Sequence, residues 1–246
     1  MHKPNGIGSI FNMPVGNYRD PILRPEAAER VRQLGEISLK GIAFPNPSNH
    51  CMIESPPFVL HLQRRIQMMQ RPNEVVITYE QTPQARIVRL NSQHPTHLIP
   101  SWSGDSVGHY EGDTLVVDTV GVKVGPLSMI DIFGTPHSEA MHLIERYRLI
   151  DYEAAKGATE KAIKEQGYAA ASAINEGVMF DPKYMGKGLQ VQFTVDDPNV
   201  FTAPWSAAVT YRRAADDWVE YVCPENTQEY YAQKNTEIPT ADTPDF

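Results

Sequence analysis

The chain has 246 residues, a length that fits one large domain, and its 41% hydrophobic and 21% charged residues are typical of a globular protein. Thirty acidic and 22 basic residues give a net charge of −8, which argues against nucleic acid as the main partner. No apolar run approaches the roughly 18 residues of a membrane span, so no membrane partner is expected either.

Residues 1–56 are rich in Gly, Asn and Pro and predict an N-terminal arm that belongs to the same domain as the rest. One helix is expected within it, beginning at Pro25 and stopping at Gly35. A β-domain is expected over residues 57–232, followed by a C-terminal tail over 233–246.

A series of short β-branched and aromatic runs predicts about nine strands, mostly sequential and joined by short turns. An antiparallel meander of this length tends to close because closure removes its edges. We therefore expect a mainly β protein with an antiparallel lipocalin- or calycin-like barrel; the alternative is a two-sheet sandwich. The ten runs from which about nine strands are expected are Phe58–Gln63, Ile66–Gln70, Val75–Glu80, Arg86–Leu90, Ser106–Tyr110, Thr114–Val120, His142–Ile150, Leu189–Val195, Trp205–Arg213 and Trp218–Cys223.

One segment interrupts this pattern. Residues 151–166 are rich in Ala, Glu and Lys and predict a helix, which begins an insertion over about residues 151–186. The insertion is interpreted as a surface segment between strands, with a lid over one mouth of the barrel as the alternative.

The stretch Ser101–Leu149 gathers titratable side chains in strand and loop positions. A histidine oriented by a carboxylate is a standard general base, and Asp118 on a half-apolar strand needs such a partner. We therefore predict His137 or His142 as base or acid and Asp118 as the orienting group. A second proton donor is expected from His109 or Tyr79.

Two arginines, Arg86 and Arg146, are candidates for holding an oxyanion or phenolate of the substrate. Trp102, Tyr110 and Tyr147 would supply an aromatic lining for a hydrophobic or phenolic ligand. Each of these side chains, taken singly, also fits an ordinary core or rim position.

The histidines and the carboxylate also match the ligands of zinc or non-haem iron, and His94 and His97 add an HxxH spacing. This signal is weak, so no metal and no organic cofactor is predicted. Ser106 formally lies in a GxSxG sequence, but a further strand follows where a nucleophile elbow needs a helix. A Cys223 thiol nucleophile is a weaker alternative.

The sequences SVGHYEGDTLVVDTVG and GTPHSEAMHLIERYR resemble a largely uncharacterised family of bacterial proteins that are commonly exported and lipocalin-like. The resemblance runs from about Pro57 to Asn226 and implies a periplasmic or secreted mature form. The opening residues lack the apolar core of a signal peptide, so the protein is cytoplasmic if no leader was removed. Cys51 and Cys223 could form one disulfide in an oxidising compartment, or remain reduced.

These observations predict a cofactor-independent acid–base enzyme (a lyase, isomerase, cyclase or hydrolase) acting on a small hydrophobic or aromatic molecule in the barrel. The alternatives are a lipocalin-like carrier and a metal-dependent enzyme that uses the histidines. A carrier would have its histidines outside an apolar lumen, whereas the enzyme would have a His–carboxylate pair facing inward. The expected partner is a small molecule, with a second copy of the chain as a further candidate.

Overall fold

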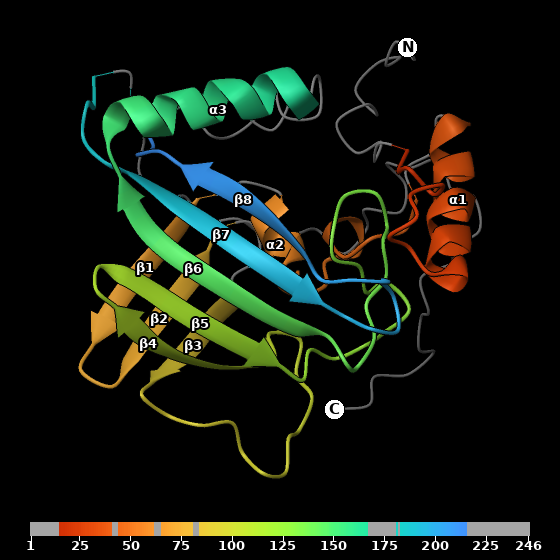
Figure 1. Ribbon diagram of the computed structural model, residues 1–246, viewed down its shortest axis with the longest axis horizontal. Coiled ribbons are helices and arrows are strands. Elements are labelled where there is room, and N and C mark those ends of the chain that lie inside the picture. Colours follow the sequence, from red (N-terminus) through yellow and green to blue (C-terminus); the bar gives the residue numbers. More distant parts are fainter. Residues whose placement is uncertain are drawn as a thin grey trace, which may run out of the picture.

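The computed structural model describes residues 15–40, 44–61, 65–80, 84–166, 181 and 183–215. Its main feature is one eight-stranded sheet that curls strongly into a half-barrel, with the strands in chain order (Figure 1). The strands are β1 (Ile66–Arg71), β2 (Glu74–Tyr79), β3 (Gln84–Leu90), β4 (Asp105–Glu111), β5 (Thr114–Val120), β6 (His142–Ile150), β7 (Gly188–Asp196) and β8 (Trp205–Tyr211).

All neighbouring strands are antiparallel except β3 and β4, which pair in parallel with Val88 opposite Ser106. The connection over residues 91–104 is long enough to carry the chain back to the end from which β3 starts. The prediction of a mainly β protein is confirmed, but the prediction of a wholly antiparallel sheet is wrong at this step. The predicted strand Trp218–Cys223 lies outside the described residues.

The β4–β5 hairpin has Glu111 opposite Thr114, so its loop consists of Gly112 and Asp113. Gly112 has a φ of 62°, a left-handed conformation that glycine adopts without a steric penalty. The two strands therefore join in a tight antiparallel hairpin.

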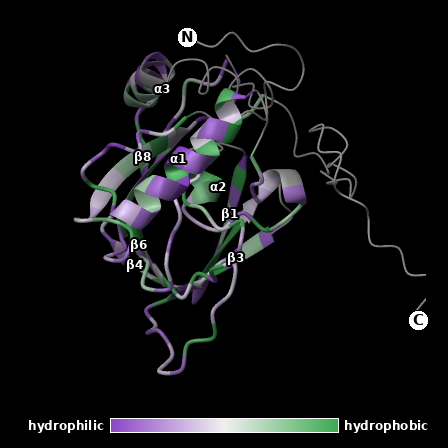
Figure 2. Ribbon diagram, turned by 90° about the vertical axis from the view of Figure 1, so that its right-hand side faces the viewer, coloured by the Kyte–Doolittle hydropathy of each residue, from purple (hydrophilic) through white to green (hydrophobic). Residues whose placement is uncertain are grey.

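Two helices differ from the prediction. Helix α1 (Pro25–Leu39) continues past Gly35, where a Cβ would lie 2.9 Å from Cγ1 of Val15. This glycine therefore allows a close packing contact inside the helix and does not end it. Hydrophilic and hydrophobic residues alternate around α1 (Figure 2). The predicted strand Phe58–Gln63 is wrong, because the chain forms the short helix α2 (Phe58–His61) there.

The predicted helix after β6 is confirmed as α3 (Tyr152–Gln166), which contacts β7 and β8 and lies across one end of the half-barrel (Figure 1). Most of the remaining predicted insertion lies outside the described residues. In the ranges that the structure covers, no helix has the length and apolar character needed to cross a membrane.

The concave face of the sheet carries the hydrophobic core. Alternate residues of every strand point inward, and Val59 and Leu60 of α2 pack among them. The His61 ring meets Phe193 of β7 edge-on at a centroid distance of 5.6 Å. Helix α2 therefore fills the end of the half-barrel that is opposite to the β4–β5 hairpin.

The N-terminal segment is tied to the connection between β7 and β8. The Arg24 amide donates to the Val200 carbonyl at 2.8 Å, and the Thr202 amide donates to the Ile22 carbonyl at 2.8 Å. Near the end of the segment, η2 (Ser48–His50) is followed by Cys51, which is disulfide-bonded. The other cysteine of the sequence, Cys223, lies outside the described residues.

Candidate functional site

The concave face contains a buried ion pair between Arg86 of β3 and Glu145 of β6. The side chains are 1% and 0% exposed, and Nη1 of Arg86 lies 3.0 Å from Oε1 of Glu145, while Nη2 donates to Oε2. Two strands separate β3 from β6 in the sheet, so the arginine side chain reaches across both of them. The arrangement is bidentate, the strongest geometry for this pair.

The strands between them provide the remaining partners of the guanidinium. Arg86 Nε donates to the Ser106 hydroxyl at 2.9 Å, and Nη2 donates to the Thr119 hydroxyl at 2.6 Å. Ser106 and Thr119 face each other across β4 and β5, with their oxygens 3.0 Å apart. Burial alone would lower the pKa of Arg86, but the Glu145 carboxylate raises that pKa well above its usual range.

Tyrosine hydroxyls surround the same carboxylate. The Tyr147 hydroxyl donates to Oε1 of Glu145 at 2.8 Å. Burial raises the pKa of Tyr147, Tyr79 and Tyr211, and the Glu145 charge raises each of them further. All three phenols therefore stay protonated at neutral pH, and Tyr147 uses its proton in the hydrogen bond to Glu145.

Tyr147 also forms the floor of a cleft of about 350 Å³ on the concave face. Leu115 and Tyr147, each 3% exposed, line the deepest part of the cleft. Leu149 and Tyr110 lie at its mouth and are 57% and 45% exposed. The cleft lies between the edge strand β1 and strands β5 to β7, beside the β4–β5 hairpin. It is lined by Ile66, Met68, Gln70, Tyr110, Asp113, Leu115, Tyr147, Leu149 and Leu189.

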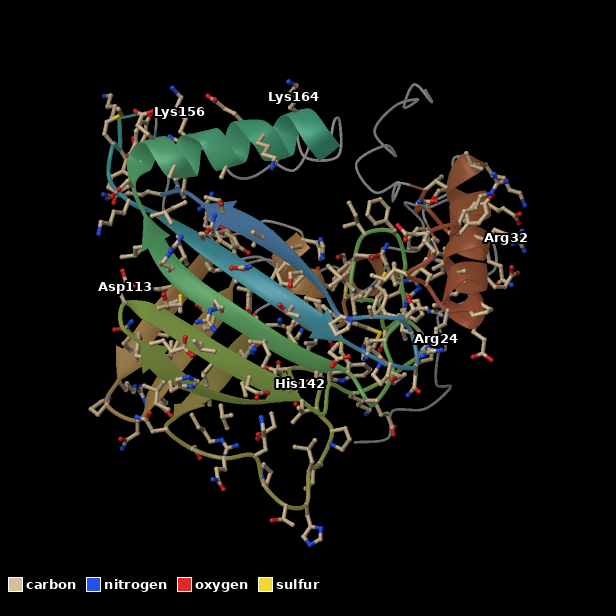
Figure 3. All side chains as sticks on the ribbon, in the orientation of Figure 1. Arg24, Arg32, Asp113, His142, Lys156 and Lys164 are labelled. Carbon is tan, nitrogen blue, oxygen red and sulfur yellow. The ribbon has the colours of Figure 1, made fainter. Side chains whose placement is uncertain are left out.

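The predicted His–carboxylate pair is present but lies on the outer face of the sheet. Nε2 of His142 is 2.7 Å from Oδ1 of Asp118, and the two side chains are 43% and 36% exposed. Figure 3 shows His142 at the start of β6, far from Asp113 at the hairpin beside the cleft. The predicted partnership of these two residues is thus confirmed as a contact, whereas their catalytic role stays a prediction.

His94 extends this outer pair into a network. Its Nδ1 is 2.6 Å from Oδ1 of Asp105, and its Nε2 is 3.3 Å from Oδ1 of Asp118. Arg89 binds both oxygens of Asp105 at 2.7 and 2.8 Å. The network connects the 91–104 loop to strands β3 to β6.

The other predicted site residues are dispersed. His137 is buried in the loop before β6, with Nδ1 3.3 Å from the Ser138 carbonyl oxygen and no partner for Nε2. His109 lies on the outer face, 3.2 Å from Glu111, which also pairs with Arg146. Trp102 lies under the Lys123 ammonium and does not line the cleft.

Of the predicted site residues, the structure brings Tyr110 and Tyr147 to the cleft, and Arg86 and Tyr79 to the polar cluster around Glu145. The Tyr110 hydroxyl accepts a hydrogen bond from the Gln70 amide at 2.8 Å. Within the described ranges, no three His, Cys, Asp or Glu side chains are placed to hold a metal ion.

Glu145 is the residue that the sequence reasoning missed. It shares the inward face of β6 with Leu143 and Tyr147, both buried. A carboxylate in an apolar row needs a buried partner, the same argument that singled out Asp118. This signal was therefore available, but it did not say which arginine would pair with Glu145.

Comparison with protein-family models, curated proteins and solved structures finds no match for this chain.

Proposed function

We propose that the protein binds a small, mainly apolar organic molecule in the cleft of the half-barrel, in the manner of a lipocalin. The observation that carries the proposal is the cleft itself, which has largely apolar walls and the hydrogen-bonded Tyr147 at its floor. A volume of about 350 Å³ falls within the range of small-molecule sites. Two apolar side chains at the mouth and a polar cluster behind the floor suit a ligand with one polar end.

The test uses N-phenyl-1-naphthylamine, a neutral dye whose fluorescence rises in apolar surroundings. We expect saturable binding, and a loss of affinity of about tenfold or more in Leu189→Trp, which fills the cleft. The matched control is Ile87→Trp, an exposed apolar position on the outer face of β3. Equal affinity in the two variants, with both folded by circular dichroism, would reject the cleft as the binding site.

Acid–base catalysis on the bound molecule is the second candidate, and the Tyr147–Glu145–Arg86 arrangement favours it. Tyr147 would turn its hydroxyl from Glu145 to an oxygen of the substrate and polarise that oxygen by donating a hydrogen bond, so the phenol keeps its proton, as its raised pKa requires. His109 and His142 lie on the outer face of the sheet, away from the cleft, so this version of the proposal relies on tyrosine as the proton donor. It requires neither a metal nor an organic cofactor.

This second candidate can be tested before the substrate is known. In D₂O, an enzyme that donates a hydrogen bond to a bound ketone oxygen makes the ketone's α-protons more acidic, so they pass to the solvent faster and are replaced by deuterons from it. We expect the protein to accelerate deuterium incorporation into the methyl group of acetophenone, and Tyr147→Phe to lose that acceleration. Binding of acetophenone without any acceleration, in the wild-type protein, would favour a carrier.

We also propose that the protein works in an oxidising compartment, the periplasm or the exterior. The disulfide-bonded Cys51 supports this location, because disulfides persist there and are rare in a reducing cytoplasm. The denatured, unreduced protein isolated from its own cell should be about 2 Da lighter than after reduction. Identical masses would argue for a reducing location.

A further inference from the structure

The polar cluster behind the cleft contains buried hydrogen-bond donors without acceptors. Tyr79 is 2% exposed, and its hydroxyl makes no hydrogen bond of good geometry, although Arg86 and Tyr147 are near enough to affect its pKa. The Tyr211 hydroxyl is likewise buried and unpaired, and Tyr79 is near enough to it to raise its pKa. A buried donor without a partner costs about 1–3 kcal/mol, so native proteins rarely retain several near one another.

Tyr79 is close to the inner end of the cleft. It lies opposite Ile66 in the register of β1 and β2, and Ile66 lines the cleft. On the other side, Tyr147 is both the floor of the cleft and a neighbour near enough to affect the pKa of Tyr79. Only side chains therefore separate the cleft from the Tyr79 hydroxyl, and Ile66 and Met68 belong to an edge strand that can adjust.

We propose that the ligand carries a neutral hydrogen-bond acceptor, of the ketone, aldehyde or ether class, that the Tyr79 hydroxyl receives at the inner end of the cleft. This inference rests on the proposed binding function and names the chemistry of its ligand. An oxygen acceptor would give the unpaired Tyr79 donor its partner, with the Tyr211 hydroxyl as a second donor to the same region.

The charges around Tyr79 select a neutral group. Arg86 is already neutralised by Glu145, so a carboxylate entering beside them would face the Glu145 charge without a free cation. An ammonium group would lose its hydration while Glu145 is already committed to Arg86 and Tyr147. The phenol protons stay in place because the pKa values of these tyrosines are raised.

The experiment compares four molecules of similar shape as competitors of N-phenyl-1-naphthylamine: acetophenone, ethylbenzene, benzoate and benzylamine. In a purely apolar cleft ethylbenzene binds best, because acetophenone has a hydrated oxygen to give up. We expect acetophenone to bind at least about threefold more tightly than ethylbenzene, and benzoate and benzylamine to bind most weakly.

Two variants test whether the Tyr79 hydroxyl causes the preference for acetophenone over ethylbenzene. Tyr79→Phe should remove the advantage of acetophenone while leaving the affinities for the dye and for ethylbenzene within about twofold. Because the hydroxyl has no partner, Tyr79→Phe should also leave the midpoint of urea unfolding unchanged or raise it. The control is Tyr18→Phe, in the N-terminal segment away from the cleft, which should retain the wild-type preference.

The outcomes separate the two proposals. If neither the dye nor any of the four molecules binds, the proposed function fails. If the dye binds but ethylbenzene is preferred, or if Tyr79→Phe keeps the acetophenone advantage, the acceptor-class inference fails and cleft binding stands. A large loss of stability in Tyr79→Phe would also overturn the inference, because it would mean that the hydroxyl has a structural partner.

Discussion

Arg86 and Glu145 are 59 residues apart in the sequence, yet their side chains form the most buried ion pair of the described structure. The pair spans four strands of the half-barrel, because Arg86 crosses over Ser106 and Thr119 before it reaches Glu145. It therefore links β3, on one side of the parallel step, to β6, on the other. Both the cleft floor and the tyrosine donors are positioned around it.

Removing one partner of this pair should be strongly destabilising. Glu145→Gln or Arg86→Met leaves an uncompensated buried charge, so we expect a loss of about 3–5 kcal/mol in the free energy of unfolding. The double variant Arg86→Met/Glu145→Leu should recover much of it. Urea denaturation measures the loss in the single variants and the recovery in the double variant.

The matched control is Glu74→Gln, which breaks the exposed Arg71–Glu74 pair and should cost less than about 1 kcal/mol. Equal losses in Glu145→Gln and Glu74→Gln would contradict the burial of the pair.

The effect of His142→Ala shows whether the function lies at the outer His142–Asp118 pair or at the inner cleft with its tyrosine cluster. If the cleft is the site, His142→Ala should bind N-phenyl-1-naphthylamine within about twofold of the wild type, because the imidazole lies on the other face of the sheet. The same variant should keep any acceleration of deuterium exchange into acetophenone. Loss of binding or exchange in His142→Ala, with the fold intact, would return the function to His142, one of the two histidines that the sequence analysis proposed as base or acid.

Much of the strand pattern could be predicted because alternation in β2, β5, β6 and β7 is a local property of the sequence. The parallel step between β3 and β4 could not be predicted, because it depends on where the 91–104 loop delivers the chain. The predicted strand at Phe58 failed because a short apolar run does not distinguish a strand from a turn of helix.

In the candidate site, too, the residue types could be predicted locally, but their arrangement in space could not. Asp118 and His142 were matched from their residue types, but only the strand register shows that they face away from the core. Glu145 and Arg86 were separated by too much sequence for a pattern to join them. A local pattern indicates that a buried charge needs a partner, and the curl of the sheet selects which one.

His94 is expected to hold the 91–104 loop on the sheet. Residues 91–101 of this loop are exposed apart from His94 and Leu98, and His94 contacts both Asp105 and Asp118. In His94→Ala, backbone amides of the loop should exchange with deuterium about three- to tenfold faster, while the core strands keep their rates. His97→Ala, an exposed change in the same loop, is the control. Equal exchange in the two variants would mean that Leu98 and the backbone contacts fix the loop without His94.

Two buried histidines should make the fold sensitive to acid. Burial lowers the pKa of His61 and of His137 below the usual value of 6.5, with Asp131 and Asp197 respectively opposing the shift. The unfolded chain therefore takes up protons first as the pH falls, and the stability contributed by the neutral rings is present above about pH 6.5 and lost below it. Each histidine can contribute at most about 1.4 kcal/mol per pH unit.

The measurement is the free energy of unfolding in urea at several values between pH 7.5 and pH 5. His61→Phe, which keeps an aromatic ring beside Phe193, should lose less stability over this range than the wild type, and His61→Phe/His137→Gln less still. His97→Ala should follow the wild-type curve, because the His97 side chain is exposed and the substitution removes no buried ring. Parallel curves for all four proteins would show that the acid sensitivity comes from carboxylates, and that the two buried rings accept protons without opening the structure.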